Sequence, residues 1–149
     1  MLDKIRIEKL EKNMIEDVFE IEKTFFDLKT NQSILDSFDS NNLFYFVLFF
    51  ENQVVGFLEC SVVLDEAELF EIAIKKEFQG RKFSIELMKF FFDFCKSKNV
   101  RTIFLEVNKI NNKAISLYEK FGFKEYSIRK KYYGDNDAVL MKCEVDDVV

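Results

Sequence analysis

Two side chains in the second half of the chain are suited to moving protons, Glu106 and Tyr118. Glu106 stands one residue before the end of the strand-like run RTIFLEV, and Tyr118 follows twelve residues later in a helix-like run. A carboxylate at a strand end accepts a proton directly or through a water, and a phenol donates one. Tyr118 shares a helical face with Asn111 and Ile115, because the three are spaced i, i+4 and i+7. Taken alone, a strand glutamate is usually a solvated side chain, and a helix tyrosine with an apolar flank is usually a core residue whose hydroxyl reaches water.

A third feature is the turn FQGRKFS, residues 78–84, between an apolar strand-like run and a helix-like run. A strand, a polar turn and a helix start form a layout that binds phosphate, because backbone amides at the helix start point at the anion. Such turns are usually rich in glycine, whereas this one has only Gly80, followed by Lys82 and Ser84. A left-handed Lys82 would be strained by about 1–2 kcal/mol, and a helical Lys82 would not. The turn is therefore either an anion site or a plain connection.

The apolar periodicity predicts the elements that must position these residues. Strand-like runs cover residues 4–10, 43–50, 54–63, 67–75, 101–107, 123–131 and 137–145, and helix-like runs cover about residues 13–23, 31–38, 83–98 and 111–121. We expect Asn13 to cap the first helix, Asn111 or Asn112 to begin the last one, and Gly122 to end it. The order β-α-(α)-β-β-β-α-β-α-β-β predicts an α/β (α+β) fold with a mixed sheet, in a single domain of residues 1–149. Its strand–helix–strand unit should be a right-handed parallel crossover, whose ligands bind beyond the carboxyl ends of the strands.

Composition excludes several classes of protein. The chain has 149 residues, a net charge of −5 and no histidine, which argues against a nucleic-acid binder, a histidine-based triad and most zinc sites. Its three cysteines are far apart and suggest no disulfide framework. The N-terminus is charged throughout, and the longest apolar run, residues 43–50, is too short to span a membrane. We therefore expect a cytoplasmic protein without membrane contact, and a reaction that needs no metal.

Four blocks of the sequence resemble the GNAT superfamily of N-acetyltransferases. They are LDEAELFEIAI (64–74), then Gln79, then LEVNKINNKAISLYEKFGF (105–123), then RKKYYGDNDAVLM (129–141). The blocks stand in the family's order and spacing, over about the C-terminal three-fifths of the chain. Within the superfamily the chain is most similar to the RimI-type enzymes, which acetylate the N-terminal alanine of a small-subunit ribosomal protein. The resemblance implies the GNAT fold and an acetyl-CoA-dependent acyltransferase.

The resemblance also implies roles for particular residues. Glu106 matches the position of the general base and Tyr118 that of the general acid in RimI-type enzymes. Acetyl-CoA is expected on the strand that holds the pantetheine arm, on the turn and helix start that hold the pyrophosphate, and on one asparagine. These positions are Ile72, Ala73, Ile74, Gln79, Gly80, Arg81, Lys82, Phe83, Ser84, Ile85 and Asn111.

The chain departs from the family pattern at two places. In the turn, the two positions that are usually small hold Lys82 and Ser84. After the first helix, TFFDLKTNQ replaces a Phe-Pro-Trp-Ser-like segment on which the substrate peptide docks in RimI-type chains. Tyr132, Tyr133 and Asp135 are either part of a peptide groove or plain strand-end residues.

The acceptor is expected to be a primary amine. At pH 7 an α-amino group, with a pKa of about 7.7–8.0, is more than a hundredfold more often neutral than a lysine, with a pKa of about 10.4. A glutamate base therefore favours the N-terminus of a protein, for instance of a ribosomal protein, as the acceptor. A small amine or a lysine side chain as acceptor, and a non-catalytic CoA-binding protein, are the alternatives.

Overall fold

The computed structural model describes residues 4–27 and 30–145, and it has the predicted order of elements. Its helices and strands are β1 (Ile5–Lys9), α1 (Ile15–Phe26), α2 (Gln32–Asp39), β2 (Leu43–Phe50), β3 (Gln53–Val63), β4 (Glu66–Ile74), α3 (Phe83–Ser97), β5 (Thr102–Asn108), α4 (Asn112–Lys120), β6 (Lys124–Tyr133) and β7 (Asn136–Glu144). Within the described residues, seven strands pair in the order β1-β2-β3-β4-β5-β7-β6. Among the strand pairs whose register the structure defines, only β4 and β5 are parallel, as the predicted crossover requires.

The start of the first helix differs from the prediction that Asn13 caps it. Asn13 lies inside a short 3-10 turn, Lys12–Met14, and α1 follows with Met14 at its N-cap position. The backbone amide of Met14 donates to the carbonyl of Glu11 at 2.9 Å, which closes this turn. Because the chain already turns before Ile15, the asparagine side chain is not needed as the cap.

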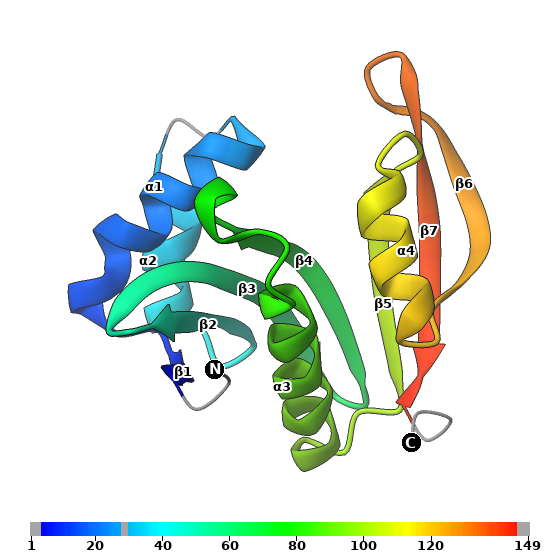
Figure 1. The fold of residues 1–149 in the computed structure, drawn as a ribbon. Helices are drawn as coiled ribbons and strands as arrows, with labels where there is room; N and C mark the ends of the chain where they lie inside the picture. The colour runs from blue at the N-terminus through cyan, green and yellow to red at the C-terminus, as the bar shows by residue number, and fades with distance from the viewer. Residues whose placement is uncertain (1–3, 28–29, 146–149) are drawn as a thin grey trace. The chain divides into compact units, whose positions relative to one another are not determined.

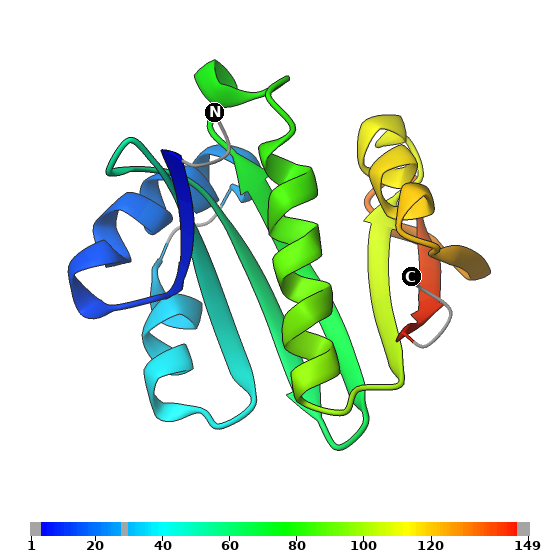
Figure 2. The ribbon, with the colours of Figure 1, turned by 60° about the horizontal axis from the view of Figure 1, so that its bottom comes forward.

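The chain forms two compact units, which divide β4 after Phe70 and α3 after Phe91. The first unit comprises residues 1–61 and 71–91, and Figure 2 shows its helices on both faces of its strands. Helices α1 and α2 cover one face with a cluster of buried side chains, which includes Val18, Ile21, Ile34, Tyr45, Val47 and Phe57. On the other face, Phe90 of α3 packs edge-on against Phe46, with 5.0 Å between ring centroids. The first unit thus has apolar packing on both sides of its strands.

Strand β2 explains part of the phenylalanine excess of the sequence. Its run LFYFVLFF is buried from Tyr45 to Phe50, because helices cover both faces. It returns into β3 through a two-residue hairpin, in which Glu51 and Asn52 both have positive φ, of 51° and 66°. Such a turn matches the right-handed twist of the two strands.

The second unit comprises residues 62–70 and 92–149. Here the first half of β4 pairs with β5, β5 pairs with β7 and β7 pairs with β6, and Figure 1 shows α4 alongside β5. Helix α4 ends as predicted at Gly122, whose φ is +92°. The amide of Gly122 donates to Glu119 and that of Phe123 to Tyr118, which satisfies the last helical carbonyls.

Three smaller points complete the fold. The three cysteines, Cys60, Cys95 and Cys143, are buried and form no disulfide, as expected. No helix in the described part of the chain is long and apolar enough to cross a membrane. Residues 28 and 29, in the middle of the segment TFFDLKTNQ, lie outside the described residues.

Candidate active site

Glu106 lies on β5, within the second unit, and forms an ion pair. Alternate residues of β5 are buried, and Glu106 belongs to the other, less buried set, with 23% of its side chain exposed. Its Oε1 lies 3.0 Å from a guanidinium nitrogen of Arg129 on β6. Because β7 separates β5 from β6, the two side chains reach each other across one strand. The ion pair orients the Glu106 carboxylate and offsets its charge.

A second carboxylate shares this face of the sheet. Glu68 on β4 is paired in register with Phe104, so that Glu68, Phe104 and Glu106 point to the same side. Partial burial raises the pKa of Glu68, the negative charge of Glu106 raises it further, and Arg129 opposes the rise. The face therefore carries two acids and one guanidinium, an environment that attracts a cationic amine.

Tyr118 lies on α4 with only 8% of its surface exposed. Its ring packs edge-on against Phe123, with 5.9 Å between centroids. Burial, and to a smaller extent Tyr133, raise the pKa of Tyr118 to about 12. The phenol therefore stays protonated at any physiological pH, as a proton donor must.

Tyr133 connects the two predicted catalytic residues electrostatically. It contributes to the raised pKa of Tyr118, and its own pKa is raised by burial and then by the charge of Glu106. Tyr133 ends β6, packs edge-on against Tyr132 and shares the second unit with Glu106 and Tyr118. Sequence reasoning left open whether Tyr133 belongs to a site, and its electrostatic interaction with both residues favours a place in the site.

Asn111 begins the last helix, one of the two predicted starting positions. Its Oδ1 accepts a hydrogen bond from the backbone amide of Ala114 at 3.2 Å, which is a side-chain cap. The cap uses the oxygen end of the side chain, so the amide nitrogen is the end suited to donate to a ligand.

The turn of residues 79–85 lies in the first unit. Of the two backbone conformations considered for Lys82, it has the strained, left-handed one. Gly80 has φ +82° and Lys82 has φ +66°, so Lys82 is left-handed and does not belong to the first helical turn. The first helical hydrogen bond of α3 runs from the amide of Glu86 to the carbonyl of Lys82 at 3.3 Å. The amides of residues 83–85 precede it and have no helical acceptor, as at any helix start. The turn therefore presents the donors that an anion site uses.

Replacing Lys82 by glycine should stabilise the protein. Glycine adopts positive φ without strain, and after its greater freedom in the unfolded chain is subtracted, a gain of about 0.5–1 kcal/mol remains. Thermal unfolding should show a melting temperature higher by about 1–4 °C. Lys82→Ala is the matched control, since it removes the ammonium but keeps the strained backbone. Equal melting temperatures for the glycine and alanine variants would contradict the strain.

The strand that precedes this turn is held at its end by Gln79. The side-chain nitrogen of Gln79 donates to the carbonyl of Ile74 at 2.9 Å, so this residue fixes the end of β4. On the neighbouring strand, a Cβ added at Gly56 would lie 2.7 Å from the carbonyl oxygen of Ala73. Sequence reasoning missed Gly56, which lets β3 approach the backbone of the predicted pantetheine strand.

The comparison with protein families identifies the family to which the chain belongs. The model of the acetyltransferase (GNAT) family matches residues 12–123. The chain belongs to the GNAT family. The resemblance seen in the sequence is thereby confirmed. Glu106, Tyr118, Asn111 and the turn of residues 79–85 all lie within the matched range.

Relatives within the GNAT family are similar to this chain over different lengths. The ribosomal protein bS18-alanine N-acetyltransferase of Haemophilus influenzae is 46% identical over 97 residues, which are 62% of this chain and 66% of the relative. The alignment thus spans slightly less than two thirds of that enzyme. A Bacillus subtilis protein, provisionally given the same activity, is 34% identical over 140 residues, which are 89% of this chain and 91% of that protein.

A solved GNAT structure confirms the predicted fold. The ribosomal-protein-S18-alanine N-acetyltransferase from Escherichia coli superimposes with a TM-score of 0.87 at 29% sequence identity. The superposition covers 95% of this chain and 94% of that chain.

Besides Gly56, sequence reasoning missed two sets of residues. The first is the pairing of Glu106 with Arg129, which depends on the order of β5, β7 and β6. The second is a group of three buried acids in the first unit, Glu22, Glu59 and Glu71. One signal was visible in the sequence, because Glu22 recurs at helical spacing with the apolar residues of the first helix.

Proposed function

We propose that this GNAT protein is an acetyl-CoA-dependent N-acetyltransferase whose acceptor is the N-terminal α-amino group of a protein. Its membership of the family supports the reaction, and the names of the Haemophilus and Escherichia enzymes support a ribosomal protein, bS18, as the acceptor. The observation that carries the mechanism is the second unit's pair of groups, an ion-paired Glu106 and a buried Tyr118 kept neutral by its raised pKa.

The two groups divide the proton transfers of the reaction between them. Glu106 takes a proton from the α-ammonium group, directly or through a water, and the neutral nitrogen attacks the carbonyl carbon of the acetyl thioester. A carbon–nitrogen bond forms, the carbon–sulfur bond breaks, and Tyr118 donates its proton to the departing thiolate. The nitrogen of the new amide bond loses its second proton, through solvent, to the phenolate that Tyr118 has become, and Glu106 releases the first proton to solvent, so that the phenol and the carboxylate are both restored. The products are the acetylated N-terminus and CoA.

The cofactor residues are proposed from the family pattern and from the turn. The backbone of Ile72, Ala73 and Ile74 would hold the pantetheine arm, and the turn of residues 79–85 would hold the pyrophosphate on its amides. Gly80 has open space around it, since nothing lies within 4 Å of a Cβ built there. Lys82 supplies an ammonium in place of the usual small residue, and Asn111 supplies an amide. Gln79 acts through its bond to the Ile74 carbonyl.

The groups around the predicted base favour a cationic amine as acceptor. Glu68 and Glu106 share one face, and Tyr133 lies near both predicted catalytic groups. An α-ammonium group loses its proton readily and so becomes a nucleophile. The ammonium group of a lysine has a pKa about two and a half units higher and holds its proton more tightly. A protein N-terminus is therefore the acceptor best matched to a carboxylate base.

A screen of acceptors tests the proposal. Purified protein and acetyl-CoA are mixed with peptides that begin with Ala, Ser, Met or Gly, including the N-terminal sequence of bS18, and release of CoA thiol is followed. We expect turnover on α-amino peptides, greatest on alanine, and little on polyamines or on N-terminally blocked lysine peptides. Preference for a polyamine or for lysine would replace the proposed acceptor. Saturable binding of acetyl-CoA without thiol release on any amine would instead indicate a non-catalytic CoA-binding protein.

A further inference from the structure

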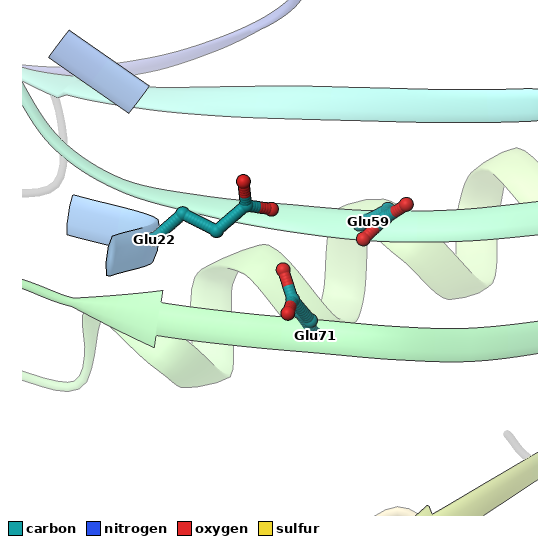
Figure 3. A group of neighbouring side chains, drawn as sticks. All are labelled: Glu22, Glu59 and Glu71. Atoms are coloured by element: carbon teal, nitrogen blue, oxygen red, sulfur yellow. The ribbon is translucent and has the colours of Figure 1, made fainter. Parts of the chain in front are cut away.

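Three glutamates of the first unit converge in its interior, and none of them pairs with a lysine or arginine among residues 4–27 and 30–145. Glu22 comes from α1, Glu59 from β3 and Glu71 from β4, and Figure 3 shows their side chains gathered in one place. One oxygen of each lies within 4.8 Å of the others. Glu22 is only 1% exposed and Glu59 only 7%. The arrangement joins three segments that are far apart in the sequence.

Two hydroxyl groups satisfy part of this carboxylate cluster of Glu22, Glu59 and Glu71. The Tyr45 hydroxyl donates to Oε2 of Glu22 at 2.9 Å, and the Ser33 hydroxyl donates to Oε2 of Glu59 at 3.0 Å. Within the described residues, Oε1 of Glu22 and Oε1 of Glu71 are buried and have no hydrogen-bond partner. Figure 3 shows the Glu22 carboxyl group reaching from α1 towards the other two. A buried acceptor without a hydrogen-bond donor costs free energy. We therefore expect a further group, absent from the chain itself, to bind these two carboxylate oxygens.

The missing component must carry positive charge. No lysine or arginine pairs with any of the three glutamates in the part of the chain that the structure describes. Buried carboxylates at this separation repel one another strongly unless protons or a cation neutralise them. The two solutions differ in geometry, because a proton joins two oxygens whereas a metal ion gathers oxygens from all three side chains.

We propose that Glu22, Glu59 and Glu71 form a binding site for one divalent cation, with Ca²⁺ as the ion of best fit. Carboxylate oxygens are the ligands of hard cations, and Ca²⁺ binds them at about 2.3–2.6 Å. Three oxygens that all lie within 4.8 Å of one another are close enough to be gathered around one such ion. Mg²⁺ usually keeps several waters and is rarely held by protein oxygens alone, so a largely buried group of three carboxylates favours Ca²⁺. The orphaned oxygens of Glu22 and Glu71 supply two of the ligands.

The bound ion would act on the stability of the first unit and not on the reaction. It would tie α1 to β3 and β4, and through the Ser33 bond to Glu59 it would include α2. The predicted catalytic residues, Glu106 and Tyr118, belong to the other unit. No proton transfer of the proposed mechanism uses the cluster, so the expectation of a reaction without a metal is unaffected.

Terbium luminescence tests the site directly. Tb³⁺ replaces Ca²⁺ at oxygen sites, and the chain has no tryptophan, so a nearby tyrosine must sensitise the ion. In full-length protein freed of metal with a chelator, we expect saturable Tb³⁺ luminescence with one site, competed away by Ca²⁺. Glu71→Gln should abolish it, and Tyr45→Phe should reduce the luminescence several-fold while leaving calorimetric binding of Ca²⁺ in place. Glu66→Gln, an exposed glutamate of the same strand, is the matched control and should bind as the unaltered chain does.

Calorimetry and thermal unfolding decide between a cation and protons. The proposal expects one Ca²⁺ per chain and a melting temperature that rises by several degrees with millimolar Ca²⁺ at pH 8, with neither effect in Glu71→Gln or Glu59→Gln. Absence of Ca²⁺, Mn²⁺ and Mg²⁺ binding by the unaltered protein overturns the proposal and leaves protons as the neutralising charge. Binding that survives both glutamine substitutions also overturns it, because the ion then sits elsewhere. The unaltered protein suffices for the first result if a variant fails to fold.

Discussion

Tyr118→Phe should lower kcat by tenfold or more and leave the affinity for acetyl-CoA nearly unchanged. The substitution removes only the phenolic hydroxyl, so the packing of the ring against Phe123 is retained. The departing thiolate then lacks its proton donor, and general acid catalysis typically contributes about 10²–10⁴-fold to a rate. Steady-state kinetics give kcat, and calorimetric titration gives the dissociation constant of acetyl-CoA.

The control for this variant is Tyr126→Phe, which removes a hydroxyl from an exposed tyrosine of the same unit. An unchanged kcat in Tyr118→Phe would remove Tyr118 from the mechanism. The pH dependence supplies a second check. Because burial raises the pKa of Tyr118 to about 12, its proton is retained at high pH, and kcat of the unaltered protein should not fall up to about pH 10. A descending limb that depends on Tyr118 below that pH would contradict the assignment.

The order of elements could be predicted because it rests on local patterns. The run LFYFVLFF is apolar at every position, and the structure has a strand with the same bounds, Leu43–Phe50. Gly122 has the left-handed backbone that ends a helix, and the amide of Phe123 closes the motif on Tyr118. Helix starts are less certain, because several polar residues compete there. The cap predicted at Asn13 was wrong, since a 3-10 turn already redirects the chain.

For the site, the sequence suggested roles for single residues, which stay predictions, but it could not give their conformations or their partners. The conformation of Lys82 was undecided, because a lysine at that position fits both a helical and a left-handed backbone, and only the packing of the turn selects one. The partner of Glu106 depends on strand order, since Arg129 lies 23 residues away along the chain on a strand that is not its direct neighbour. The cluster of Glu22, Glu59 and Glu71 is harder still, because it needs a helix and two strands in register. Interactions that join distant segments leave no periodic signal in any one of them.

Glu106→Gln should lower kcat/KM by about 100-fold at neutral pH. Glutamine has nearly the shape of glutamate but cannot accept the proton of the ammonium group. The reaction then uses only the acceptor that is already neutral, about a tenth of it at pH 7, and also loses general base catalysis, which typically contributes about 10²–10⁴-fold. The fold should tolerate the change, because the ion pair with Arg129 is partly exposed and such pairs contribute about 0–1 kcal/mol. Kinetics on an α-amino peptide measure the loss, and thermal unfolding verifies that the variant is folded.

The pH dependence of this variant separates a base from a residue that only positions the acceptor. If Glu106 is the base, raising the pH towards the pKa of the α-amino group supplies neutral amine without it, and the deficit of Glu106→Gln should shrink as the pH rises from about 7 to about 9. A positioning role predicts a deficit that is the same at every pH. Glu125→Gln, at an exposed glutamate of β6, is the matched control and should show neither effect. Activity of Glu106→Gln within threefold of the unaltered protein would exclude Glu106 as the base and direct attention to Glu68, the other carboxylate on the same face.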